Sequence, residues 1–166
     1  MSGTGRRIHI AEMRGELLRS IRNFFNQRGY LEVDTPLLIP FRIPEAPIRL
    51  FSTRFESSFE QEKALALEPS PEIWMKRLLS EGFPSCFQIC KSFRNGEQLG
   101  NQHNPEFTML EWYTKGADYN HSASTMQELL YAAGEIALSE LFLQEGVHRS
   151  MHELFLEYTG IDLDRC

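Results

Sequence analysis

The sequence predicts an α+β fold in which helices flank an antiparallel sheet. Apolar residues recur at helical spacing over residues 8–28 and again over 122–143, which is typical of amphipathic helices. Residues 86–94 and 107–114 instead alternate in polarity with a period of two, as half-buried strands do. Glycine, asparagine and proline residues lie between these two segments. This pattern indicates an antiparallel hairpin with a long polar loop.

The composition is that of an ordinary globular domain. The 166 residues are 42% hydrophobic and 24% charged, which suits one domain with a sizeable core. No stretch approaches the roughly 18 apolar residues that span a bilayer, and the N-terminus lacks the apolar region of a secretory signal. Three cysteines, an odd number, favour reduced thiols. We therefore expect a cytoplasmic protein without a membrane partner.

The N-terminal half begins with the helix over residues 8–28, and Gly29 occupies the position that often ends a helix. Residues 30–36 form a strand-like segment that stops at Pro36. A proline-containing stretch then predicts a loop followed by a short strand over 50–55, and residues 63–67 predict another short strand.

A further helix is predicted from the sequence Ser70-Pro71-Glu72. Serine is favoured as the N-cap, proline at the first helical position, and an acid in the first turn. The helix should end near Gly82. A carboxylate at a helix N-terminus is stabilising by itself, so Glu72 has a structural explanation as well as a functional one.

Near the C-terminus, Ser150 and Glu153 form the pattern of a capping box, and Gly160 would end the short helix that they begin. Four histidines have no partner at metal-ligand spacing and are expected on the surface: His9, His121, His148 and His152. We therefore predict no metal site within the chain.

The hairpin carries the most suggestive side chains. The alternation places Arg94 on the polar face of the first strand, and Phe107, Glu111 and Tyr113 on one face of the second. A cation, an aromatic ring, a carboxylate and a phenol suit a ligand that combines a phosphate, a flat base and an amine. The pattern alone is equally compatible with an edge hairpin that carries ordinary solvated residues.

Several segments resemble class II aminoacyl-tRNA synthetases of the lysyl branch. Phe93-Arg94-Asn95 followed by HNPEFTMLE resembles motif 2, RGYLEVDTPLL resembles motif 1, and SPEIWMKRLL and MHELFLEYTGIDL resemble further lysyl-type segments. The resemblance runs over nearly the whole chain. It implies a class II synthetase-like catalytic fold with motifs 1 and 2 present and motif 3 absent.

The resemblance also implies an ATP site. In the family, the motif 2 arginine is catalytic and binds the α-phosphate, and the matching residue is Arg94. Phe107 would stack on adenine, and His103 would reach the β- or γ-phosphate from the loop. One residue, Gly96, departs from the family pattern, so Glu97 would take the family glutamate's place at the adenine amino group if Gly96 bulges out. Magnesium ligands are expected beyond residue 166.

The amino-acid pocket and the assembly follow from the same resemblance. Glu72, Glu111 and Tyr113 would bind the ammonium groups of a lysine-like substrate. Pro36 matches the family proline at the boundary of the homodimer, so a homodimer is expected.

The layout of residues 1–166 is that expected for the N-terminal part of such a catalytic domain, without an anticodon-binding domain. It resembles the lysyl-tRNA-synthetase-like enzymes that attach β-lysine to a lysine of elongation factor P. The expected activity is ATP-dependent activation of lysine or β-lysine as an adenylate, although the 166 residues alone should be inactive. Two alternatives stay open: a fragment of a conventional lysyl-tRNA synthetase with tRNA as acceptor, and a non-catalytic paralogue that dimerises or binds a partner.

Overall fold

A computed structural model describes residues 3–41, 48–56, 58–59, 61–100, 102–137 and 146–165. The chain divides into two compact units, one made of Met1–Leu17 with Ala123–Cys166 and the other of Leu18–Ser122. In the part of the chain that the structure describes, no helix combines the length and the apolar character needed to cross a membrane.

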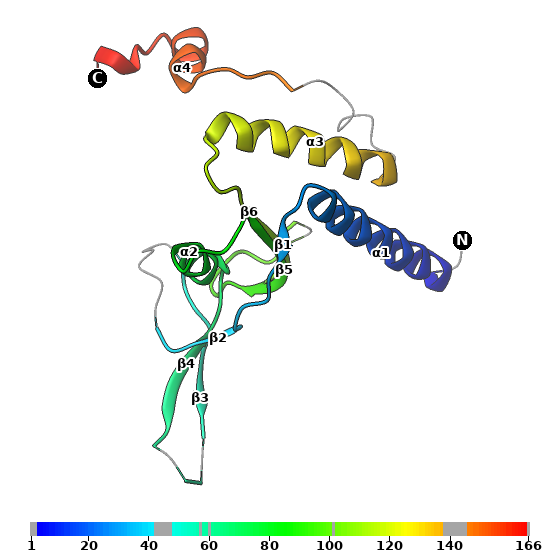
Figure 1. The fold of residues 1–166 in the computed structure, drawn as a ribbon, viewed down its shortest axis with the longest axis vertical. Helices are drawn as coiled ribbons and strands as arrows, with labels where there is room; N and C mark the ends of the chain where they lie inside the picture. Colours follow the sequence, from blue (N-terminus) through cyan, green and yellow to red (C-terminus); the bar gives the residue numbers. More distant parts are fainter. Residues whose placement is uncertain are drawn as a thin grey trace. The chain divides into compact units, whose positions relative to one another are not determined.

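The first sheet of the Leu18–Ser122 unit contains the predicted hairpin. Strands β5 (Cys86–Phe93) and β6 (Glu106–Tyr113) pair antiparallel, and β1 (Leu31–Glu32) completes the order β1-β5-β6 (Figure 1). The hairpin is confirmed to within one residue at each strand end. The antiparallel pairing expected for the hairpin is observed, and β1, whose pairing was not predicted, lies parallel to β5. The chain between these two strands crosses through a second sheet and a helix, as a parallel pair requires.

The second sheet has the order β2-β4-β3 and is antiparallel throughout. Strands β3 (Ser52–Phe55) and β4 (Lys63–Leu67) confirm the two short strands that were predicted, whereas β2 (Leu38–Ile39) was not predicted. The backbone of Glu68 links the two sheets. Its N–H donates to the Leu37 carbonyl and its carbonyl accepts from the Phe93 N–H, each at 2.9 Å.

Helix α1 (Gly3–Gln27) ends where predicted, before Gly29 with φ of 76°, but begins five residues earlier than the apolar spacing suggested. The extra residues are polar or glycine, so they add nothing to a hydrophobic pattern. Its last turn packs on the first sheet. The Phe25 ring stacks on Phe87 at 4.8 Å between centroids and contacts Tyr30 and Trp112 at 5.1 and 5.6 Å.

Helix α2 (Glu72–Ser80) begins one residue later than predicted, because Pro71 and not Ser70 is the N-cap residue. Ser70 still serves the helix terminus, since its Oγ accepts a hydrogen bond from the Glu72 N–H at 3.2 Å. The helix stops before Gly82, as expected, and this glycine has a φ of 99°.

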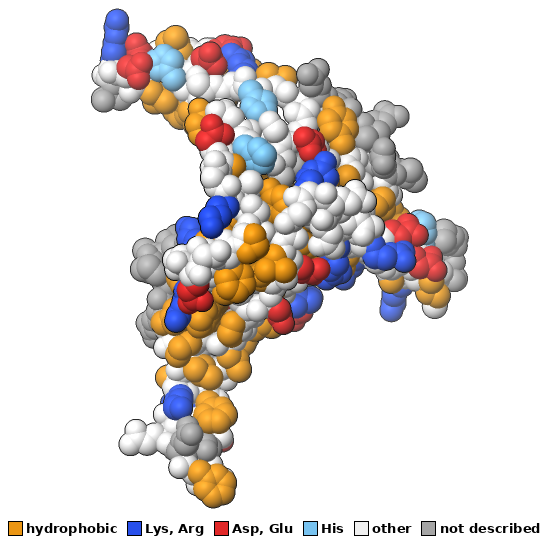
Figure 2. All heavy atoms as spheres, in the orientation of Figure 1, with side chains coloured by type: hydrophobic (Ala, Val, Ile, Leu, Met, Phe, Trp, Pro, Cys, Tyr) orange, Lys and Arg blue, Asp and Glu red, His pale blue; other side chains and the backbone are white. Residues whose placement is uncertain are grey.

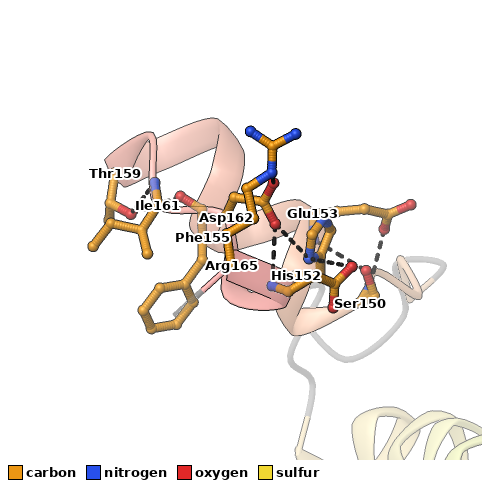
Figure 3. Close-up of polar contacts among 9 residues, drawn as sticks. Ser150, His152, Glu153, Phe155, Thr159, Ile161, Asp162 and Arg165 are labelled. Atoms are coloured by element: carbon orange, nitrogen blue, oxygen red, sulfur yellow. Dashed lines mark hydrogen bonds and ion pairs between the residues drawn. The ribbon is translucent and has the colours of Figure 1, made fainter.

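The other unit contains most of α3 (Tyr119–Ala137), then α4 (Met151–Thr159) and a short 3-10 helix, η2 (Leu163–Arg165). The last part of the predicted helix over 122–143 lies outside the described residues. The capping box at Ser150 is confirmed: its Oγ accepts from the Glu153 N–H and its N–H donates to Glu153 Oε2 (Figure 3). Gly160 ends α4 with a φ of 72°.

Candidate functional site

The strand register places the predicted polar side chains on one face of the hairpin. Residues directly opposite each other in an antiparallel pair project to the same side. Phe107 is opposite Ser92, Glu111 is opposite Gln88, and Tyr113 is opposite Cys86. Phe107, Glu111 and Tyr113 therefore share a face with the polar residues of β5, as the alternation predicted.

Arg94 and Phe107 lie together at one end of this face. The guanidinium carbon of Arg94 is 5.3 Å from the centroid of the Phe107 ring, within the range of a cation–π contact. Arg94 Nη1 is 3.9 Å from Glu97 Oε1. Among the described residues, Arg94 Nε is buried without a hydrogen-bond partner. A buried guanidinium N–H that lacks a partner is a donor available to an anionic ligand.

The chain bends at Gly96, two residues after Arg94. Its φ of 76° lies in the left-handed region, and a Cβ built on it would lie 3.0 Å from Arg49 Cδ. The Asn95 N–H donates to the Arg49 carbonyl at 2.8 Å, which holds the residue just before Gly96 against Arg49. Only glycine meets both conditions without strain. The turn brings Glu97 beside Arg94, while its contact to adenine remains a prediction.

His103 is not part of this group in the structure. It is exposed, and its carbonyl accepts from the Gly100 N–H at 3.2 Å within the loop. No described contact joins its imidazole to Arg94, so a phosphate-binding role for His103 remains a prediction.

Two residues of β6 and one residue of the turn before α2 meet at the other end of the face. The Tyr113 hydroxyl donates to Glu111 Oε1 at 2.9 Å, and Ser70 Oγ donates to Glu111 Oε2 at 3.3 Å. Because Ser70 also accepts from the Glu72 N–H, it connects the start of α2 to the carboxylate on β6. The Glu72 side chain forms an ion pair with Lys76 one turn later. Sequence reasoning treated Ser70 only as a helix cap and missed this link.

Burial, the hydrogen bond to Glu111, and the charges of Glu111 and Glu72 together raise the pKa of Tyr113 well above its usual value. The phenol therefore keeps its proton and acts as a donor to Glu111 at any physiological pH. A carboxylate that accepts two hydroxyl donors is held in one orientation.

Two buried polar residues near this face were not identified from the sequence. Glu68 and Gln88 are each 1% exposed. Both carboxylate oxygens of Glu68, and both polar atoms of the Gln88 amide, lack a hydrogen-bond partner among the described residues. Burial raises the pKa of Glu68 to about 8. Alternation along β5 was a signal for Gln88, which shares the polar face with Arg94, but no pattern marked Glu68 at the end of β4.

Pro36 is exposed, and it lies in the wall of a cavity of about 280 Å³ with Asp34, Trp74 and Arg77. Exposed leucines surround it in the sequence: Leu31, Leu37 and Leu38. These features are compatible with a subunit boundary, which remains a prediction.

A cavity of about 570 Å³ lies along β2, β3 and β4, and none of the predicted site residues lines it. Figure 2 shows hydrophobic side chains gathered over this part of the molecule. Phe55 and Phe59 are exposed there, at 47% and 98%.

His152 has acidic neighbours, contrary to the expectation that it has no partner at ligand spacing. Its Nδ1 lies 3.6 Å from Asp164 Oδ2 and 3.9 Å from Asp162 Oδ1 (Figure 3). The turn at Gly160 brings η2 back against α4, so residues ten or more positions apart meet. Arg165 Nε also lies 3.2 Å from Asp162 Oδ2, so a cation already neutralises one carboxylate of this group.

The chain is similar to known proteins over most of its length. The family model described as tRNA synthetases class II (D, K and N) matches residues 5–162. Elongation factor P--(R)-beta-lysine ligases from Histophilus somni (strain 2336) and from Avibacterium paragallinarum are each 42% identical over 150 residues, which is 90% of this chain. The protein of the same name from Haemophilus influenzae (strain PittGG) is also 42% identical over 150 residues. The chain spans 44% of the length of these relatives.

Proposed function

Because the chain belongs to the class II tRNA synthetases of the D, K and N group, we propose that the full-length protein activates lysine or β-lysine with ATP and transfers it to a lysine of elongation factor P. The activated form would be an aminoacyl adenylate. The names of relatives 42% identical to the chain support the ligation of a lysine-type residue to elongation factor P. One structural observation carries the proposal: a cation–aromatic pair and a carboxylate–phenol pair lie on the same face of one hairpin.

Arg94 and Phe107 suit the nucleotide end of this site. ATP supplies a phosphorus atom that a carboxylate can attack with loss of pyrophosphate. Arg94 is always cationic, and its planar group can bind two oxygens while it neutralises the charge that develops at phosphorus. Phe107 offers an aromatic face to adenine, and its contact with Arg94 holds both groups in place before any ligand arrives. In this proposal Arg94 is the catalytic residue, and Glu97 and His103 complete the nucleotide site.

Glu111, Tyr113 and Glu72 suit the amino-acid end. Hydrogen bonds from Tyr113 and Ser70 orient the Glu111 carboxylate toward one ligand position. Ser70 ties that carboxylate to the start of α2, where Glu72 lies. Carboxylates that a bound substrate covers need cations as partners, so a diamino acid is a better match than an apolar or acidic one.

The magnesium that the family uses does not fit the group of possible metal ligands around His152. His152, Asp162 and Asp164 place ligand atoms within 4.8 Å of one another. Magnesium prefers oxygen ligands in octahedral geometry, and this group contains an imidazole and a carboxylate already paired with Arg165. We assign no step to a metal bound by these residues, and we keep the expectation that the magnesium ligands lie beyond residue 166.

We also propose that residues 1–166 form the N-terminal part of a catalytic domain that dimerises near Pro36 and acts in the cytoplasm. The exposed leucines around Pro36 support the interface. The activity belongs to the full-length protein, and residues 1–166 alone are expected not to catalyse it.

The test offers the full-length protein two acceptors. It is incubated with ATP and either lysine or β-lysine, together with elongation factor P or lysine tRNA, and both acceptors are analysed by mass spectrometry. We expect elongation factor P to gain the mass of one lysyl-type residue, and a variant with its acceptor lysine changed to arginine to gain none. Charging of tRNA instead would identify a conventional lysyl-tRNA synthetase. Modification of neither acceptor would favour the non-catalytic alternative.

A further inference from the structure

A histidine and two aspartates converge beside the first turn of α4. The capping box at Ser150 fixes the start of this helix, so His152 lies in its first turn. Gly160 ends the helix with a φ of 72°, in the left-handed region, and the chain then returns as η2. The turn brings Asp162 and Asp164 back to His152, and one ligand atom of each residue lies within 4.8 Å of the other two (Figure 3). All three residues belong to one compact unit, and the hairpin site belongs to the other.

The separations within this group are longer than direct hydrogen bonds. His152 Nδ1 is 3.6 Å from Asp164 Oδ2 and 3.9 Å from Asp162 Oδ1. A hydrogen bond between a cationic N–H and a carboxylate is about 2.7–2.9 Å long. In a tetrahedral zinc site, where the bonds to nitrogen and oxygen are about 2.0–2.2 Å, neighbouring ligand atoms are about 3.3–3.6 Å apart. The observed spacing is therefore closer to that of ligands around a zinc ion than to that of a hydrogen-bonded ion pair.

The ring nitrogen that faces the two aspartates needs a partner. His152 Nδ1 is buried and has no hydrogen-bond partner among the described residues, although the side chain as a whole is 36% exposed. Each nitrogen of a neutral imidazole is either a donor or an acceptor, and buried polar atoms are rarely left without a partner. A metal ion would satisfy this nitrogen, because neutral imidazole is a common metal ligand. This observation is independent of the carboxylates.

Asp162 is oriented by neighbours that leave it able to bind a cation. Its Oδ2 lies 3.2 Å from Arg165 Nε, whereas Oδ1 is the oxygen nearer to His152. Oδ1 accepts a hydrogen bond from the Asp164 N–H at 3.1 Å. A carboxylate oxygen has two lone pairs, so Oδ1 retains one. Carboxylates that bind metals are themselves hydrogen-bonded by outer residues, and Arg165 fits that role.

Asp164 gives the group a side that is open to solvent. Its side chain is 86% exposed, so a metal ion can enter from this side and a water molecule can reach the remaining ligand position. The two carboxylates balance the two charges of a zinc ion. Imidazole together with carboxylate suits zinc, whereas magnesium prefers oxygen ligands alone. The donor set and the access thus favour zinc.

We propose that His152, Asp162 and Asp164 bind one zinc ion, with water as the fourth ligand. The ion joins the first turn of α4 to η2 and stabilises the turn at Gly160. Because binding holds together two elements that are separate in the sequence, its free energy adds to the stability of this unit. The zinc site does not depend on the proposed function, and no step of the proposed reaction passes through it.

The test measures zinc binding to the untagged full-length protein after a chelator has removed bound metals. Zinc chloride is titrated in competition with a chromophoric chelator, which gives the stoichiometry and the affinity. His152→Ala and Asp164→Asn should each lower the affinity for one equivalent of zinc by more than about 100-fold, since changes of outer residues alone cost 10- to 100-fold. His148→Ala is the matched control, because His148 is exposed and lies outside the group. This control should bind zinc as the wild type does.

Two further readouts distinguish a metal site from an ion pair. Cobalt(II) in place of zinc should give the strong visible absorption of a four-coordinate site in the wild type and in His148→Ala, but not in His152→Ala. Zinc should also raise the melting temperature of the wild type and of His148→Ala, and should leave that of His152→Ala unchanged. An ion pair without metal would produce neither result.

The inference would be overturned if the wild type bound no zinc at a large excess of the ion. Full retention of every zinc equivalent by His152→Ala and Asp164→Asn would also overturn it, as would tighter binding of magnesium than of zinc by these residues. Circular dichroism checks that each variant folds, and Asp164→Asn, at a largely exposed position, decides the question if His152→Ala does not fold. Lysine activation is measured separately, so failure of the zinc site would leave the proposed function intact.

Discussion

Two adjacent residues of β5, Phe87 and Gln88, are almost equally buried, at 0% and 1% exposed, but they face opposite sides of the hairpin. Phe87 stacks on Phe25 and belongs to an aromatic core. Gln88 belongs to the face with Glu111, and among the described residues neither of its polar side-chain atoms has a partner. The core face is complete without a ligand. The polar face is not, and this difference supports our proposal that the polar face binds the ligand while the core face holds the fold together.

The same contrast extends along the polar face. Arg94 Nε and both side-chain oxygens of Glu68, whose carbonyl accepts from the Phe93 N–H, are also buried without hydrogen-bond partners in the described part of the chain. Arg94 provides a cationic donor at one end of the face, and Glu111 provides a carboxylate at the other end. These groups match a ligand that carries a phosphate at one end and ammonium groups at the other. Substitutions on the two faces should therefore separate stability from activity.

The largest effect is expected on the core face. Phe87→Ala removes a fully buried ring that stacks on Phe25 and should lower the free energy of unfolding by about 3–5 kcal/mol. Chemical denaturation of the full-length protein measures this loss. Phe107→Ala, a half-buried ring on the polar face, is the matched control and should cost less. Equal losses at the two positions would contradict the division between the faces.

The next effect concerns the rate of reaction. Arg94→Ala removes the one cation that contacts Phe107 among the described residues, and should lower the exchange rate by roughly 100- to 1000-fold with every amino acid. Its melting temperature should stay close to that of the wild type. Arg77→Ala, an exposed arginine paired with Glu81, should leave the rate unchanged. A rate within about 3-fold of the wild type for Arg94→Ala would remove Arg94 from the catalytic step.

A smaller effect is expected from pH. Burial raises the pKa of Glu68 from 4.5 to about 8. Between pH 4.5 and about pH 8, the Glu68 carboxyl therefore keeps its proton in the folded state and has released it in the unfolded state. Stability therefore falls as pH rises, by about 2 kcal/mol between pH 6 and pH 8. The raised pKa of the Cys90 thiol keeps that neighbour neutral over this range. Denaturation at several pH values measures the slope, which should flatten in Glu68→Gln. An equal slope in that variant would show that other groups cause it.

Sequence patterns predicted the hairpin, α2 and the capping box at Ser150 because each depends on local residues. Alternation alone placed Phe107, Glu111 and Tyr113 on one face. The parallel pairing of β1 and the ion pairs of His152 depend on where distant segments meet, which no local pattern records. Glu68 was missed for a related reason, because an acid after a strand ordinarily lies in solvent, and only the junction of the two sheets buries it.

The most direct test of the central claim is ATP–pyrophosphate exchange by the full-length protein across a panel of amino acids. Two carboxylates and a phenol near one end of the polar face predict that lysine or β-lysine supports faster exchange than aspartate, asparagine or leucine. Glu111→Gln should reduce this preference by about 1.5–3 kcal/mol, because it removes a charged hydrogen-bond acceptor. Faster exchange with aspartate or asparagine than with either lysine, or an unchanged preference in Glu111→Gln, would contradict the assignment of this face to a diamino acid.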